Sequence, residues 1–385
     1  MMESRLATGC CLIVVAVAAA GIVGCGVGFM FDGPATVAAW MTMALFVLGL
    51  SLGAITVLMI HMLTGGAWGR AMYVPLRAAV TVLPLGLLLL LPVAGSLGLV
   101  FPWADGDLSG LSETARRKLA YLNTPFFLVR FAVCSVLWLC LAWLVLRWTL
   151  TADTAAGTVT RRRYHQRNAA IGLIVHVIAI SVFSVDWMMS LEPEFYSSMY
   201  PLLEISGQMA AAHALAILVL AALDTPIQAA DDRPGVSVRE DTANMLFGFV
   251  LIWVYLAFMQ WLIVWAADLP IEIHWYLLRV EGGWRYILWL LIILHFAVPF
   301  AAFLNRAVKR SRSGVMALGC IILIGHFLDV LWRVRPPVWR DSAIAGWIDG
   351  SALLAAGGLF SLAYLVALSR SDRIDSWLGR RARAG

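Results

Sequence analysis

Residues 37–60 read VAAWMTMALFVLGLSLGAITVLMI, an apolar stretch without a single ionisable side chain. An α-helix needs about 20 such residues to cross the hydrocarbon core of a bilayer. The stretch therefore predicts a membrane-spanning helix, and the chain contains more of the same kind. Ten apolar runs occupy residues 11–31, 37–60, 76–99, 126–148, 168–190, 201–222, 244–267, 284–304, 315–333 and 345–369. We expect an all-α integral membrane protein with about ten transmembrane helices.

The composition supports this class. Of the 385 residues, 62% are hydrophobic and only 13% are charged, whereas a soluble domain carries about 25% charged residues. So few charges cannot cover a globule of this size, which excludes a soluble enzyme. The net charge of +5 does not indicate a nucleic-acid partner, because the basic residues lie in short loops between apolar runs and form no basic face.

The distribution of Lys and Arg predicts the orientation. With both termini on one side of the membrane, that side receives 19 of the 28 basic residues: Arg5, Arg70, Arg77, Arg147, Arg161, Arg162, Arg163, Arg167, Arg233, Arg239, Arg306, Lys309, Arg310, Arg312, Arg370, Arg373, Arg380, Arg381 and Arg383. Short cytoplasmic loops carry the excess of basic residues. We therefore expect both termini in the cytoplasm, with residues 345–385 forming the last helix and a basic cytoplasmic tail.

The fifth and ninth runs end in similar ways, which indicates an internal repeat. Each ends in an Asp followed by a Trp and then an X-Pro pair, at Asp186, Trp187 and Glu192-Pro193, and at Asp329, Trp332 and Arg335-Pro336. Four helices separate the two segments, so both cross the membrane in the same direction. The pattern predicts two four-helix bundles, residues 37–190 and 201–333, plus flanking helices, within one polytopic domain of residues 1–385.

Few polar side chains interrupt the apolar runs. An ionisable residue inside a span is costly and marks function by default. The candidates for a proton path or a quinone pocket are His176, Asp186, His213, His326 and Asp329. Carboxylate and imidazole groups exchange protons and can hydrogen-bond a quinone ring. The structural alternative is that each of them only joins neighbouring helices by hydrogen bonds.

The two aspartates differ in their own helices. Asp329 precedes Arg333 by four residues, the spacing of an ion pair on one helical face. Asp186 has no basic neighbour in its run, so any partner must come from another helix. We expect an unpaired Asp186 to be the better proton carrier, with His176 and His213 deeper along the proton path. The alternative role for Asp329 is a purely structural ion pair with Arg333. Arg130 lies near a helix end and is given less weight.

No metal or haem is expected on this chain. None of the six cysteines belongs to a C-x-x-C or C-x-x-C-H motif. A b-type haem would need two histidines at one depth on facing helices, and His213 with His295 is the pair whose spacing leaves this possible.

Two long motifs carry a resemblance to a known family. They are Phe183-Ser-Val-Asp186-Trp-Met-Met-Ser190-Leu-Glu192-Pro193-Glu-Phe-Tyr196-Ser197, and Trp253-Val-Tyr255-Leu-Ala-Phe-Met-Gln260-Trp-Leu-Ile-Val-Trp265 followed by Asp268-Leu-Pro270 and by Trp275-Tyr276 to Glu281-Gly-Gly-Trp284. Shorter matches are His61-Met-Leu-Thr64-Gly65, Tyr121-Leu-Asn123 and His326 to Trp332. Together they resemble the ActF subunits of bacterial alternative complex III, which are related to the NrfD-like quinol-interacting membrane proteins.

The resemblance implies a membrane subunit of a complex that oxidises quinol and reduces cytochrome c or a cytochrome oxidase. It implies a location in the bacterial inner membrane and a fold of two four-helix bundles plus flanking helices. The implied partners are an ActC-like sister subunit, an iron–sulfur subunit and haem c subunits, which would carry the redox cofactors, besides membrane lipid and quinone. In that family the productive quinol site is generally assigned to the sister subunit. The stretch Ile271-Glu272-Ile273-His274 departs from the acidic segment expected there.

Three functions therefore compete. The first is a quinol-oxidoreductase subunit that contributes a proton path, a quinone pocket or both. The second is a purely structural subunit of the same complex. The third is an independent secondary transporter, for which broken helices in both halves would be typical; Pro84 and Pro92 interrupt only the first half. The sequence identifies no catalytic residue and does not specify which quinone is used.

Overall fold

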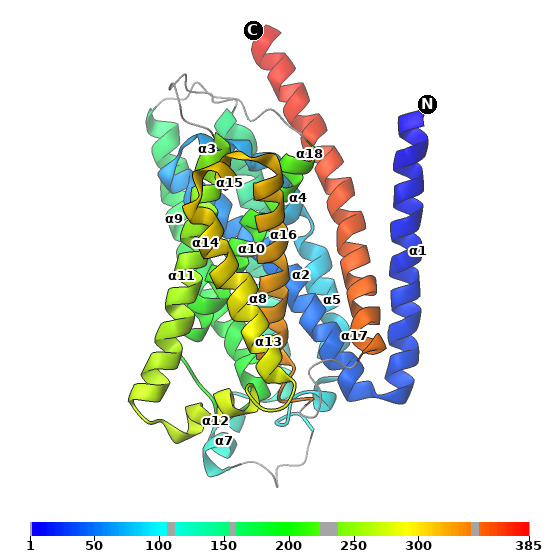
Figure 1. The fold of residues 1–385 in the computed structure, drawn as a ribbon, viewed down its shortest axis with the longest axis vertical. Coiled ribbons are helices and arrows are strands. Elements are labelled where there is room, and N and C mark those ends of the chain that lie inside the picture. The colour runs from blue at the N-terminus through cyan, green and yellow to red at the C-terminus, as the bar shows by residue number, and fades with distance from the viewer. Residues whose placement is uncertain (1, 106–111, 154–158, 224–237, 340–345, 385) are drawn as a thin grey trace.

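The computed structural model describes residues 2–105, 112–153, 159–223, 238–339 and 346–384 of the chain. All regular structure in these ranges is helical, and ten helices are long and apolar enough to span a membrane (Figure 1). The prediction of an all-α integral membrane protein is thereby confirmed. Parts of the loops near residues 100–125 and 223–243 lie outside the described ranges.

Seven of the spans are single helices: α1 (Met2–Phe31), α2 (Gly33–Thr64), α8 (Thr124–Asp153), α9 (Val159–Trp187), α10 (Tyr200–Ala222), α11 (Val238–Ala266) and α16 (Arg312–Val334). Three are composite: α4 (Tyr73–Thr81), α5 (Leu83–Leu89) and α6 (Leu91–Ala94); α13 (Trp284–Leu291), η4 (Ile292–Ala297) and α14 (Val298–Leu304); and α17 (Trp347–Ala352), η5 (Leu353–Gly357) and α18 (Gly358–Ala384). Short helices lie between spans: α3 (Ala67–Ala71), η1 (Leu97–Leu99), α7 (Glu113–Arg117), η2 (Lys118–Ala120), η3 (Met189–Leu191), α12 (Pro270–Leu278) and α15 (Arg306–Arg310).

Proline explains the breaks in the third span. Pro84 and Pro92 lack the N–H that would complete the helical ladder, and the helix ends one turn before each of them. The indole N–H of Trp40 donates to the carbonyl of Leu89 at 2.6 Å, next to the second break. A neighbouring helix therefore satisfies backbone that the break exposes, as membrane helices with proline require.

Caps define the boundaries of two central helices. The Asp32 carboxylate accepts a hydrogen bond from the Ala35 N–H at 2.9 Å and Pro34 occupies the first turn of α2, an arrangement that favours a helix start. The connection between the first two spans thus consists of Asp32 alone. Ser311 caps α16 in the same way through the Gly314 N–H.

The helices pack in two sets around α2 and α10. One set contains α2, the composite span α4–α6, α8 and α9; the other contains α10, α11, the composite span α13–α14 and α16. Helices α2 and α10 touch along Gly53, where a Cβ atom would collide with the carbonyl oxygen of Gln208. Only glycine allows the two helix backbones to come this close. The pair α1 and α18 lies against the outside of the first set (Figure 1).

Both termini lie at the same end of the molecule (Figure 1), because a chain that crosses the membrane ten times, an even number, returns to the side on which it began. Helices α3 and α15 lie at that end, and α7 and α12 lie at the opposite end. The opposite end is the outer end in the orientation that the basic residues predict. The buried polar groups described next are nearer to it.

Candidate functional site

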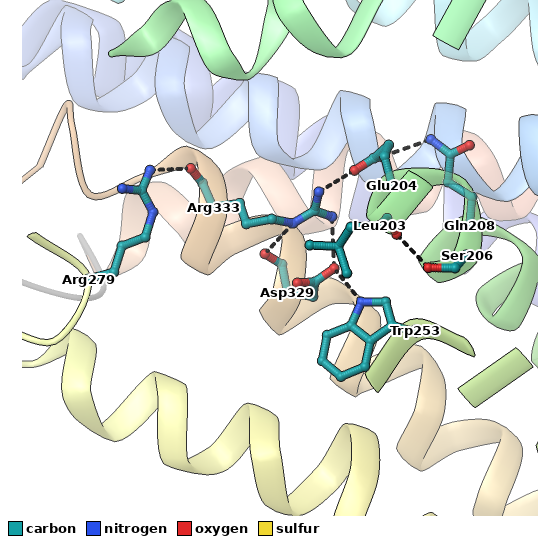
Figure 2. Close-up of polar contacts among 8 residues, drawn as sticks. All are labelled: Leu203, Glu204, Ser206, Gln208, Trp253, Arg279, Asp329 and Arg333. Atoms are coloured by element: carbon teal, nitrogen blue, oxygen red, sulfur yellow. Dashed lines mark hydrogen bonds and ion pairs between the residues drawn. The ribbon is translucent and has the colours of Figure 1, made fainter. Parts of the chain in front are cut away.

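A buried guanidinium joins two helices of the second set. Arg333, at the end of α16, donates to the Glu204 carboxylate of α10 at 2.5 Å and to the Asp329 carboxylate of its own helix at 2.8 Å (Figure 2). The side chains of the three residues are at most 4% exposed. We call Glu204, Asp329 and Arg333 the triad.

Each carboxylate of the triad has one further donor. The Trp253 indole N–H of α11 donates to Asp329 at 3.3 Å, and the Gln208 amide donates to Glu204 at 2.8 Å, as Figure 2 shows. Ser206, also drawn there, donates only to the carbonyl of Leu203. Because buried charges need partners on every side, these donors hold the carboxylates in fixed positions.

A second guanidinium closes the outer side of the triad. Arg279, just after α12, donates to the carbonyl of Arg333 at 2.8 Å and pairs with Glu192 at 2.6 Å. Its guanidinium also lies 3.6 Å from the centre of the Trp275 ring, a favourable cation–π contact. Burial lowers the pKa of Arg279, and the Glu192 carboxylate opposes that shift. Arg279 therefore ties the outer loops to the end of α16.

Beside Asp329 lies a cavity of about 620 Å³. Its lining residues belong to α11, α12, α13, η4 and α16, together with Leu203 of α10 and Val280 after α12. The lining is mostly aromatic and aliphatic: Leu203, Trp253, Val254, Ala257, Phe258, Gln260, Trp261, Val264, Trp265, Ile273, Trp275, Tyr276, Leu277, Val280, Leu288, Leu291, Ile292, Phe296, Asp329 and Trp332. Phe258 and Trp265 are at least half exposed on the outer surface of α11. The cavity therefore reaches the side of the protein that would face lipid.

Polar groups lie at two places on the cavity wall. One is Asp329 with its Trp253 donor. The other is the Gln260 amide, which donates to the Tyr276 hydroxyl at 3.3 Å and accepts from Ser197 at 3.3 Å. Burial raises the pKa of Tyr276 to about 12, so this hydroxyl keeps its proton at neutral pH. An apolar cavity with a few fixed polar groups has the character of a ligand site.

Two histidines lie next to the triad, towards the middle of the membrane. The rings of His295 and His326 are 6.4 Å apart, and His295 packs on Trp253 at 4.2 Å between ring centres. His295 belongs to the π-helix η4, a local widening that is frequent at functional sites. Gly325 provides room for it, because a Cβ there would lie 2.5 Å from the His295 Nδ1.

The first set of helices has an ion pair at Asp186, which was predicted to be an unpaired carboxylate. Arg130 of α8 donates to both oxygens of Asp186, at 2.7 and 2.9 Å. The prediction that Asp186 is unpaired was therefore wrong, although its partner does come from another helix. The Arg130 guanidinium also stacks 3.7 Å from the centre of the Tyr121 ring, and burial raises the pKa of Tyr121 to about 12. The preference for Asp186 over Asp329 has no basis in this geometry.

The other predicted residues lie apart from the triad. His176 accepts a hydrogen bond at Nδ1 from the Trp138 indole at 3.1 Å, inside the first set. His213 lies 2.9 Å from the carbonyl of Thr242, which is in the first turns of α11. The structure thus brings His326 and Asp329 together and leaves Asp186, His176 and His213 elsewhere.

Sequence reasoning missed Glu204 and underrated Arg130. Glu204 is only three residues inside the predicted span 201–222, and Arg130 is four residues inside the span 126–148. Arg130 was given less weight because it lies near a helix end, whereas Glu204 was not among the predicted candidates. A signal for Glu204 was present, because Gln208 follows it by four residues and lies on the same helical face.

The haem alternative had paired His213 with His295. In the structure the neighbour of His295 is His326, whereas His213 packs against Trp68 and Phe249. Among the residues that the structure describes, no group of three or more His, Cys, Asp and Glu is arranged to hold a metal ion.

Comparison with known proteins found no matching family model and no matching curated protein. The geometry of the site therefore carries the functional argument. The arrangement can admit an apolar ring from the lipid side, hydrogen-bond its polar substituents and exchange a proton with a carboxylate.

Proposed function

We propose that this chain is the quinone-interacting, non-haem membrane subunit of a quinol-oxidising respiratory complex, of the alternative complex III type that the sequence resembles. The observation that carries the proposal is the lipid-facing aromatic cavity with the Asp329 carboxylate in its wall. The cavity would be the quinone pocket, and Asp329 with the residues behind it would begin a proton path.

A quinone fits the chemistry of the cavity. Its volume of about 620 Å³ lies within the range of about 300–1,000 Å³ for small-molecule sites. Indole rings such as Trp253 and Trp261 can stack on a flat ring. The exposed lining residues on α11 leave a route by which an isoprenoid tail would remain in the bilayer. Asp329 and the Gln260–Tyr276 pair offer hydrogen bonds to ring oxygens at two positions.

The proposal divides the work between subunits. This chain would bind the ring and handle protons, while electrons would leave through the iron–sulfur and haem c groups of partner subunits towards cytochrome c or a cytochrome oxidase. The ActC-like sister subunit would be its neighbour in the bacterial inner membrane, and the end bearing both termini would face the cytoplasm.

Photo-crosslinking tests the pocket directly. A short-chain ubiquinone carrying a photoreactive azide is irradiated with the intact complex, and the labelled peptides are identified by mass spectrometry. We expect labelling of α11, α12 and α13 on this chain, suppressed by excess unlabelled short-chain ubiquinone. Labelling of the sister subunit alone would contradict the proposal.

A scaffold role is the second candidate, because buried ion pairs also join helices away from the cavity. Arg130–Asp186 connects α8 to α9, and Arg335–Asp349 connects the end of α16 to α17. A chain with only this role would co-purify with haem- and iron–sulfur-bearing partners but would not be labelled by the quinone probe. A secondary transporter would purify without such partners.

A further inference from the structure

The triad contains one more carboxylate than its guanidinium can neutralise. Arg333 contacts Glu204 and Asp329 together, at 2.5 and 2.8 Å. With all three groups ionised, the charges are one positive and two negative, so the triad would carry a net charge of −1. All three side chains are buried between helices that span the membrane, where an uncompensated charge is strongly unfavourable.

Among the residues that the structure describes, the surroundings of the triad do not supply the missing positive charge. On the outer side, Arg279 is matched by Glu192 at 2.6 Å. On α10, the Tyr200 ring lies 5.4 Å from the Arg333 guanidinium and its hydroxyl has no hydrogen-bond partner. On α11 the facing group is the neutral Trp253 indole. On α16 it is His326, a fully buried ring whose nitrogens have no hydrogen-bond partner that would stabilise a positive charge.

We propose that Glu204 and Asp329 share one proton across Arg333, so that the triad is a buried proton-binding site. The proposal deepens the function proposed above, and its part in quinol oxidation rests on that function. That the triad binds one proton follows from the charge count and does not depend on a ligand in the cavity. When a cavity ligand releases a proton, its O–H bond breaks and an O–H bond forms on Asp329, while the proton already shared leaves from Glu204 to the groups behind the triad. The triad thus stays neutral, and no electron is transferred to it.

The polar groups behind the triad indicate where the proton goes next. Gln208 donates to Glu204, while its own carbonyl oxygen has no partner. Neither ring nitrogen of His326 has a hydrogen-bond partner, and the ring is fully buried. A Cβ atom at Gly207 would lie 3.0 Å from the His326 Nδ1, so this glycine keeps space beside the ring. Buried polar atoms of this kind are commonly satisfied by internal water, which would join His326 to Gln208 and Glu204.

Infrared difference spectroscopy tests the shared proton. The full chain, with ¹³C-labelled carboxyl groups in Asp and Glu and embedded in lipid nanodiscs, is measured at neutral pH in H₂O and D₂O. A protonated carboxyl gives a C=O stretch that shifts in D₂O, and the label separates it from lipid esters. We expect this band in the wild type, at the intensity of one carboxyl per chain.

Two variants test whether the C=O band comes from the triad. Glu204→Gln and Asp329→Asn each leave one carboxylate for one guanidinium, so both should lose the band while remaining folded. Asp186→Asn is the matched control, because Asp186 already has Arg130 to itself; this variant should keep the band. A wild type without the band overturns the proposal, and so does a band that persists at full intensity in both triad variants.

Failure of the proton site and failure of the quinone pocket give different results. A chain that is labelled by the quinone probe but lacks the band has the pocket without the shared proton. A chain with the band that is not labelled has the proton site without the pocket.

Discussion

Arg130 and Asp186, on the neighbouring helices α8 and α9, form a two-pronged ion pair with N–O distances of 2.7 and 2.9 Å. Both side chains are less than 10% exposed. The equivalent aspartate of the second set, Asp329, shares its guanidinium with Glu204 and borders a cavity. The two ends of the apparent repeat therefore differ in chemistry, and the second borders a cavity.

The Arg130→Leu variant should lower the free energy of unfolding by about 3–5 kcal/mol, because it leaves the Asp186 carboxylate buried without a partner. Adding Asp186→Leu should restore most of the loss, since a buried ion pair replaced by apolar side chains is often neutral in stability. Denaturant unfolding in detergent, followed by tryptophan fluorescence, measures both effects.

Arg117→Leu is the control for that experiment. Arg117 pairs with Glu113 at 3.4 Å on the surface, where both side chains are more than 70% exposed. Such pairs contribute about 0–1 kcal/mol. A loss at Arg117 equal to that at Arg130 would contradict the assignment of Arg130 to a buried structural pair.

Ala257→Phe should fill part of the cavity and weaken binding of a short-chain ubiquinone at least about tenfold, which corresponds to about 1.4 kcal/mol. Ala257 lines the cavity, so a phenyl ring there would occupy the volume intended for the ligand ring. Quenching of tryptophan fluorescence by the quinone measures the affinity, since several indoles line the same wall.

The matched control for the cavity is Leu251→Phe, which adds a phenyl ring at an exposed position of the same helix, outside the cavity lining. We expect its quinone affinity to equal that of the wild type. Equal quinone affinities for the wild type, Ala257→Phe and Leu251→Phe would show that the cavity is not the binding site.

Gly53→Ala should reduce stability by about 1–3 kcal/mol through overpacking. The added methyl group would collide with the backbone carbonyl of Gln208, which cannot move independently of α10. Gly248→Ala on α11 is the control, because a Cβ there meets nothing within 4 Å; it should be neutral or stabilise by up to about 1 kcal/mol through helix propensity. Thermal unfolding of the two variants decides whether α2 and α10 pack as described.

Labelling with a membrane-impermeant maleimide should distinguish the two ends of the molecule. In a cysteine-free background, Glu281→Cys between α12 and α13 should react in intact cells. Thr64→Cys at the end of α2 should react only after permeabilisation. Both positions are exposed, and the predicted orientation places them outside and inside respectively. The reverse pattern would invert the topology.

The sequence by itself determined the class and the spans of this protein. A run such as residues 37–60 has no water-soluble alternative, because its backbone and side chains are satisfied only as a helix in an apolar medium. The positions of Pro84 and Pro92 likewise located the breaks in the third span. The Asp329–Arg333 pair was predictable as well, since four residues on a helix bring two side chains together.

Only the tertiary structure decided which polar groups meet. Asp186 looked unpaired because its partner, Arg130, is 56 residues away in the chain, and Glu204 reaches Arg333 across 129 residues. The cavity beside Asp329 is lined by residues of α11, α12, α13, η4 and α16, and the sequence of no single helix predicts it. Apolar periodicity specifies that a helix is buried in lipid or protein, but the contacts between helices depend on how they are packed. The charge balance of the site follows from those contacts.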